Sequence, residues 1–232
     1  MQYRKTLSDF MKQIDELVIV PANFGAFATI KEAQRLLAQG GRFTSLDAGT
    51  PDRAVLSNPD KPCYGLYGGQ YSFIVNFALC DEVARHLGIK EIAVEPQQEF
   101  VSRMLGVNVL TVVDLLATHP TLGRLRPWEQ DRLLLQTLKA LDGGYRSSYH
   151  RPIEFPIRAE MPDPQKRELQ ALLESLPSTG VPDTIAYLSE EEVLGVLPNL
   201  EALGFERARV LEILGTAPRR DIDYYRFSFL QK

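Results

Sequence analysis

The segment from residue 99 to residue 117 constrains the fold of this 232-residue chain more than any other part. It reads EFVSRMLGVNVLTVVDLLA, with the small residue Ser102, a turn glycine at Gly106 and Asn108 opening a second apolar run. Two short helices hold a fixed angle only when a small residue, a turn glycine and apolar residues take such places. The pattern therefore predicts two packed helices, the second over residues 108–117. The residues expected on its buried side are Thr111, Val112 and Leu115.

The same segment resembles the helix-turn-helix of DNA-binding proteins. The resemblance implies that the second helix would lie in the major groove, where exposed side chains touch bases and phosphates. The residues that could make such contacts are Arg103, Asn108, Thr111, Arg124 and Arg126. The expected outer face also carries Asp114, which would repel phosphate, and several apolar residues that suit groove contacts poorly. A plain structural helix pair, a nucleic-acid contact and a protein interface all stay open.

The overall composition indicates an ordinary soluble globular protein. Apolar residues make up 44% of the chain and charged residues 24%, with a net charge of −4 and no long basic run. This acidic balance disfavours nucleic acid as the main partner. The N-terminus is charged rather than signal-like, and no apolar stretch reaches the ~18 residues of a membrane-spanning helix. We therefore expect a cytoplasmic protein with no membrane partner, in which Cys63 and Cys80 are buried reduced thiols.

The periodicity of the sequence predicts a mainly α fold. We expect a helical body over residues 1–148 and a small α+β portion over residues 149–232, with short antiparallel strands near the C-terminus. The two parts could equally form one continuous domain. Helices are predicted at about 7–18, 30–37, 71–87, 127–143, 164–176 and 205–214, and strands at 153–157, 184–188 and 224–229. Residues 89–94 suit a short strand or a turn.

A loop rich in Pro, Gly, Asp and Asn is predicted over residues 42–69, with one short helix near residues 52–56. Long ordered loops are uncommon in compact domains and are often functional. Its last part, Tyr64–Tyr71, contains paired glycines directly before a predicted helix, where backbone amides and the helix dipole favour an anion. The candidate ligand-binding residues of this loop are Tyr67, Gly68, Gly69 and Gln70.

A second candidate segment, Tyr145–Arg151, is dense in hydrogen-bond donors at the expected domain junction. Ligand sites favour such junctions. Arg146 and Arg151 suit a carboxylate or a phosphate, and His150 could move a proton near neutral pH. The weak catalytic candidates are therefore His150, Tyr149 and Arg146, with an exposed polar connector as the alternative interpretation.

Three functional hypotheses follow from these patterns. The first is a non-enzymatic cytosolic binding or regulatory protein that uses the helix-turn-helix-like surface. The second is a small-molecule enzyme of the transferase or lyase type, with its site between the Tyr64–Tyr71 loop and the Tyr145–Arg151 segment. The third is an assembly or toxin-neutralising partner. We expect no cofactor and no metal, and a partner that is either a protein or a small anionic ligand; a homo-oligomer stays open.

Overall fold

The computed structural model describes residues 3–14, 17–60, 63–67, 70–146, 153–178, 180–184, 186–216 and 220–232, with only the backbone at 66, 67, 70 and 71. Two compact units divide the chain. Unit 1 is Met1–Phe100 with Arg219–Lys232, and unit 2 is Val101–Pro218. The predicted boundary near residue 148 concerns parts that fold separately, and it stays a prediction. The two units are defined instead by the contacts within the chain, which divide the chain after Phe100 and before Arg219.

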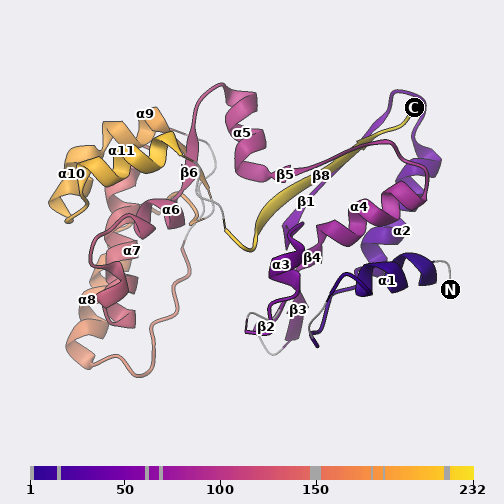
Figure 1. Ribbon diagram of the computed structural model, residues 1–232. Helices are drawn as coiled ribbons and strands as arrows, with labels where there is room; N and C mark the ends of the chain where they lie inside the picture. Colours follow the sequence, from indigo (N-terminus) through magenta and orange to yellow (C-terminus); the bar gives the residue numbers. More distant parts are fainter. Residues whose placement is uncertain are drawn as a thin grey trace. The chain divides into compact units, whose positions relative to one another are not determined.

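Unit 1 is built around a four-stranded sheet in the order β4-β1-β8-β5 (Figure 1). Its strands are β1 (Arg42–Thr50), β4 (Val75–Asn76), β5 (Glu91–Pro96) and β8 (Asp223–Leu230). A separate hairpin joins β2 (Tyr64–Tyr67) to β3 (Gln70–Phe73). The helices described in this unit are α1 (Arg4–Met11), α2 (Phe24–Leu36), α3 (Arg53–Leu56) and α4 (Phe77–His86), followed by α5 (Gln97–Leu105), which crosses the unit boundary.

Strand β8 lies at the centre of this sheet although it comes from the far end of the sequence. It pairs antiparallel with β1 on one side and with β5 on the other, so that Phe229 is opposite both Phe43 and Ile92. The short strand β4 pairs parallel with the end of β1, where Gly49 is opposite Val75. The sheet is therefore mixed, and most of it comes from the N-terminal half of the chain.

This sheet contradicts the predicted fold class. Residues 42–50 are a nine-residue strand, not the first part of a long loop, and strands are not confined to the C-terminal part. The segment has few apolar residues, so its sequence does not predict a strand. Five of its nine residues are exposed in the structure. Its partner β8 supplies the hydrogen bonds from more than 170 residues further along the chain. The short helix expected near residues 52–56 is confirmed as α3.

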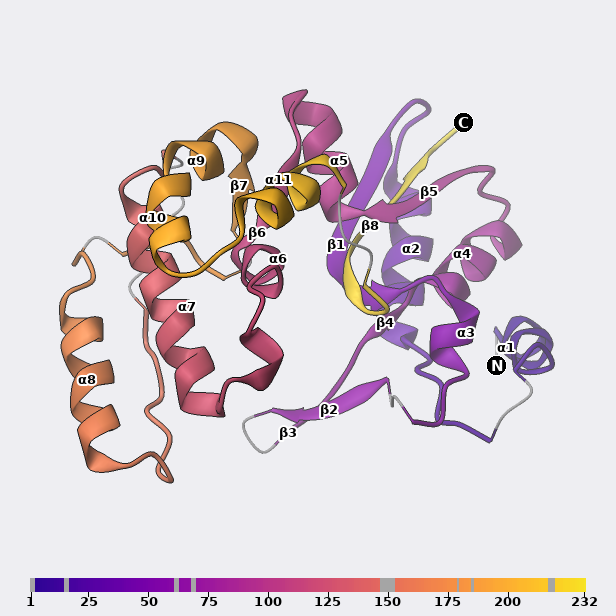
Figure 2. The same ribbon diagram turned by 60° about the vertical axis from the view of Figure 1, so that its left-hand side comes forward.

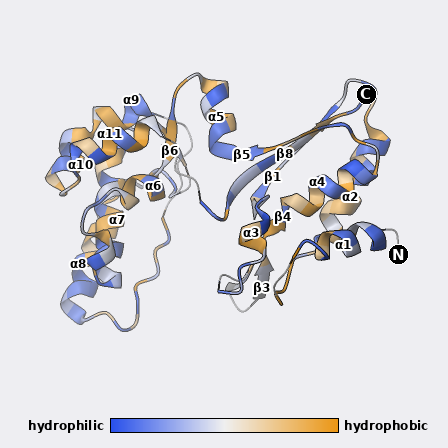
Figure 3. Cartoon of the chain, viewed as in Figure 1, coloured by the Kyte–Doolittle hydropathy of each residue, from blue (hydrophilic) through white to orange (hydrophobic). Residues whose placement is uncertain are grey.

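Helices α2 and α4 cover one face of the sheet (Figures 1 and 2). Phe27 and Ile30 from α2, Val83 from α4, and Phe227 and Phe229 from β8 belong to one buried cluster. Since side chains alternate across a strand, Phe227 and Phe229 share the face that the helices cover. Orange segments of α4 in Figure 3 mark this apolar contribution.

The opposite face of β8 carries a buried arginine. Arg226 forms an ion pair with Glu95 on β5, and its guanidinium lies 4.3 Å from the ring centre of Phe100 at the start of α5. Burying a charge is favourable only when the charge is paired. The pair with Glu95 therefore explains how this strand tolerates an arginine at its centre.

The helix predicted over residues 71–87 begins later than expected. Residues 70–73 and 75–76 are strands, and α4 begins at Phe77. The side chain of Asn76 accepts a hydrogen bond from the Leu79 backbone N–H at 2.9 Å, which caps the helix and fixes its first residue. Helix α2, in contrast, begins earlier than expected, at Phe24 rather than near residue 30.

Unit 2 contains a helical core with one short pair of antiparallel strands. The strands are β6 (Val109–Thr111) and β7 (Tyr187–Ser189). The helices are α6 (Val112–Ala117), the 3₁₀ helix η1 (Leu122–Arg124), α7 (Pro127–Asp142), α8 (Asp163–Glu174), α9 (Glu190–Gly195), α10 (Leu197–Ala202) and α11 (Arg207–Gly215). The predicted helices at 127–143 and 164–176 are confirmed by α7 and α8, whereas 153–157 is not a strand.

The predicted second helix of the helix-turn-helix-like pair is wrong over its first half. Gly106 does form a turn, with φ of 70°, but Val109–Thr111 then pairs with β7 as a strand. The helix begins only at Val112, because the Thr111 side chain and Asp114 form a reciprocal cap there. The helix that remains has six residues and directly follows a buried strand. It is therefore too short to present an extended face to a DNA groove.

In the described part of the chain, the longest helix is α7, with 16 residues. None of the helices described combines the length and the apolarity needed to cross a membrane.

Candidate functional site

The two ligand segments expected from the sequence belong to different units. Tyr67 and Gln70 are backbone partners in the β2–β3 hairpin of unit 1. Arg146 is in unit 2, where its exposed guanidinium lies 2.7 Å from Glu191 and its backbone N–H donates to Glu192. The candidates that lie outside the described residues are Gly68, Gly69, Tyr149, His150 and Arg151. A single site from both segments stays a prediction.

The nucleic-acid candidates are spread over several environments. Thr111 is 9% exposed and its hydroxyl donates to Asp114 at 2.7 Å, so its side chain is already engaged as a helix cap. Arg126 pairs with Glu129 at 2.7 Å and lies over the ring of Trp128. Arg103, Asn108 and Arg124 are exposed.

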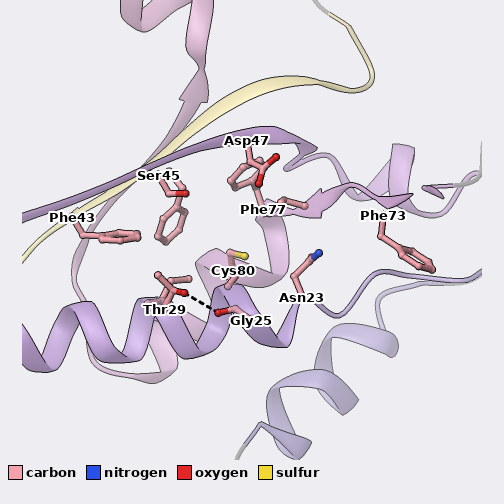
Figure 4. Close-up of a pocket in the computed structure, with 13 residues that line it drawn as sticks. Asn23, Gly25, Thr29, Phe43, Ser45, Asp47, Phe73, Phe77 and Cys80 are labelled. Carbon is pink, nitrogen blue, oxygen red and sulfur yellow. Dashed lines mark hydrogen bonds between the residues drawn. The ribbon is translucent and has the colours of Figure 1, made fainter. Parts of the chain in front are cut away.

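A cavity of about 470 Å³ in unit 1 lies between α2 and the sheet (Figure 4). Helix α2 forms one wall, strand β1 forms the opposite wall, and the residues around β4 close one end. Typical small-molecule sites have volumes of roughly 300–1,000 Å³ and mostly apolar walls. This cavity is therefore large enough for a small organic ligand, and it is formed by unit 1 alone.

Four phenylalanine side chains line this cavity, among them Phe43, Phe77 and Phe227. Phe43 contacts Phe227 edge to face, with ring centres 6.5 Å apart, and both rings line the cavity. Phe77 and Phe227 are 2% exposed and form part of the buried core, whereas Phe73 is 51% exposed. The aromatic part of the lining therefore extends from buried rings to the exposed ring of Phe73.

A hydrogen-bonded pair of asparagines fixes the end of the cavity where α2 begins. Asn23 donates to the Ile74 carbonyl at 3.2 Å and accepts the Asn76 backbone N–H at 2.9 Å. Asn76 is fully buried and donates to the Pro21 carbonyl at 3.2 Å. These bonds connect β4 to the chain before α2, and so they hold Phe73 and Val75 beside the cavity.

Asp47 is the charged residue of the cavity lining. One of its carboxylate oxygens accepts the Ala48 N–H at 2.8 Å, and no described residue forms an ion pair with it. Ser45 lies two residues away on the same face of β1, and Thr29 lines the facing wall. The rim thus combines one unpaired negative charge with hydroxyl groups, next to a large aromatic surface.

Cys80 lines the cavity but is only 2% exposed. Burial raises the pKa of its thiol to about 12, and the neighbouring Asp81 carboxylate adds to this shift. The thiolate is the nucleophilic form of cysteine. This thiol is therefore held in its unreactive, protonated form at neutral pH, and it serves as an apolar part of the wall.

We expect Cys80 to resist alkylation in the native protein at neutral and mildly alkaline pH. Cys63 is also buried, and burial raises the pKa of its thiol as well, so both should react only after unfolding. The measurement is the rate of iodoacetamide labelling at each cysteine by mass spectrometry, with denatured protein as the control. Rapid native labelling of Cys80 would show that the cavity wall opens.

Sequence reasoning missed this cavity because its lining comes from segments that are far apart along the chain. Phe43, Ser45 and Asp47 lie on one face of β1, in the segment that was expected to be a loop, and no alternation of apolar and polar residues marks that segment as a strand. Within the described residues, no group of three or more His, Cys, Asp or Glu side chains could hold a metal ion. No protein-family model matches the chain, and no curated protein or solved structure matches it either.

Proposed function

We propose that this chain is a binding protein whose unit 1 holds a small organic cation with an aromatic or other bulky apolar group. The observation that carries the proposal is the unpaired carboxylate of Asp47 at the rim of an aromatic cavity. The apolar group of the ligand would lie among Phe43, Phe77 and Phe227, and its ammonium group would face Asp47.

Two physical effects support a cation over an anion. Aromatic ring faces attract positive charge with an energy of roughly 0.5–2 kcal/mol each. An ion pair with an exposed carboxylate adds up to about 1 kcal/mol, whereas an anion beside Asp47 would be repelled. The protonated state of Cys80 favours binding over covalent chemistry at this wall.

We expect phenethylamine, used as a probe, to bind saturably and phenylacetate to bind much more weakly, since the two differ mainly in the sign of charge. Asp47→Asn should weaken phenethylamine binding by up to about fivefold, which is ~1 kcal/mol. Isothermal titration calorimetry measures both quantities, and circular dichroism checks that the variant is folded. Equal binding of the amine and the carboxylate, or no binding of either, would overturn the proposal.

Gly25 offers a matched pair of variants that test whether the cavity itself is the site. It lines the cavity, and a Cβ atom at this position would meet no other atom within 4 Å. Gly25→Ala should therefore bind the probe as before, whereas Gly25→Leu should fill the cavity and abolish binding. If Gly25→Leu still binds with unchanged affinity, the probe lies elsewhere.

A further inference from the structure

A second cavity, of about 160 Å³, lies between α7 and α8 in unit 2. Two buried polar atoms belong to its lining residues, Trp128 Nε1 and Gln165 Oε1, and neither has a hydrogen-bond partner among the described residues. The indole N–H can only donate, and the amide oxygen can only accept. Buried polar groups in proteins are nearly always paired. These two atoms therefore lack a partner, and a ligand that both accepts and donates hydrogen bonds would supply one for each.

The two helices contribute opposite chemistry to this cavity. On α7, Arg132 lies one turn after Trp128. Glu129 also lines this wall, but its carboxylate is paired with Arg126 at 2.7 Å, so the groups that this wall leaves to a ligand are donors. On α8, Glu168 lies one turn after Gln165, so the facing wall presents acceptors. Arg132 and Glu168 form an ion pair at 3.2 Å, with side chains 44% and 52% exposed. Exposed pairs of this kind contribute little stability, so a ligand can replace their mutual contact.

The position of the Trp128 ring is already fixed by its neighbours. The Arg126 guanidinium lies 4.7 Å from the ring centre, and Arg126 is itself held by Glu129 at 2.7 Å. One face of the indole is therefore covered by a cation. Its N–H is buried and has no hydrogen-bond partner among the described residues.

We propose that this cavity binds a free α-amino acid with a small side chain. The carboxylate would accept from Trp128 Nε1–H and Arg132, and the ammonium group would donate to Gln165 Oε1 and Glu168. A zwitterion has the charge separation that the two walls present, and a cation or an anion alone would leave one wall unpaired.

The size and the floor of the cavity agree with this ligand. A water molecule occupies roughly 30 Å³ in the liquid, so one water would leave most of the space empty. Met161 and Leu169, each 2% exposed, supply an apolar surface for a small side chain.

The experiment uses Trp128, the single tryptophan of the chain, as the reporter. Titration of the full chain with glycine, alanine or serine is expected to change its fluorescence saturably. Calorimetry in parallel detects binding that leaves the fluorescence unchanged. Acetate and methylamine, which each carry one half of the zwitterion, should not bind measurably.

Gln165→Leu removes the acceptor while keeping a similar size, and it should weaken amino-acid binding at least tenfold. The matched control is Gln170→Leu on the same helix, where the exposed glutamine pairs with Glu174 at 3.0 Å and does not line the cavity. Its affinity should be unchanged. The proposal is overturned if none of these amino acids binds by either method, if acetate binds equally well, or if Gln165→Leu binds like the unaltered chain.

Discussion

Replacing Gly49 with alanine is expected to lower the free energy of unfolding of unit 1 by roughly 3 kcal/mol or more, a loss that marks severe overpacking. Gly49 lies where β1 meets β4, opposite Val75. A Cβ atom there would overlap the Val75 carbonyl oxygen and lie 2.8 Å from the Phe77 ring. The carbonyl belongs to the backbone, so the two strands would have to separate.

The measurement is chemical denaturation followed by circular dichroism. Val75 and Phe77 also line the cavity, so Gly49→Ala should lose phenethylamine binding even where it remains folded. Gly25→Ala is the matched control, since its added methyl group enters open space. If both alanine variants unfold at the same denaturant concentration, the close approach of β1 and β4 is not as described.

Replacing Asp114 with alanine should lower the free energy of unfolding of unit 2 by about 2–4 kcal/mol, the combined effect of a lost cap and buried unpaired donors. Asp114 is only 3% exposed. Its carboxylate accepts the backbone N–H of Thr111 at 2.9 Å and the Thr111 hydroxyl at 2.7 Å. Removing it leaves the Thr111 N–H buried at the junction of β6 and α6.

Glu129 is a matched control for this prediction because it has the same place in the cap of α7. It accepts the Arg126 N–H at 2.8 Å, and the Arg126 side chain is 61% exposed. Water can replace these bonds, so Glu129→Ala should cost much less stability than Asp114→Ala. Equal losses in urea denaturation would mean that burial of the Asp114 cap contributes nothing.

Some helices and strands could be predicted from the sequence because the pattern that marks them lies within a few residues of the element itself. Pro127 at the first helical position predicted the start of α7, and the alternating aromatic residues from 224 to 229 predicted β8. A reciprocal cap between Ser189 and Glu192 begins α9 in the same local way. In each case the signal is a cap, a helix start or an alternation that the residues carry themselves.

The fold class and the cavity depend on pairings between distant residues, which the sequence does not show. Arg42–Thr50 has the composition of a loop and becomes a strand because β8 lies beside it. The apolar run around Val109 was assigned to a helix, since short apolar runs suit helices and strands alike, and β7 decides the outcome. The cavity depends on the same pairing, because β1 forms the wall that faces α2.

The central position of β8 sets an order of events during synthesis. Strands β1 and β5 leave the ribosome early, but the strand that joins them follows only after residues 101–218 have been made. At roughly 5–20 residues per second, synthesis of that stretch takes from about 6 to about 24 seconds. Throughout it, the backbone groups of residues 42–50 and 91–96 that β8 later pairs are left without that partner, and unpaired backbone groups of this kind can pair with another chain. We therefore expect these segments to be most open to pairing with another chain while the nascent chain is still incomplete, and a chaperone that shields them would act in that interval.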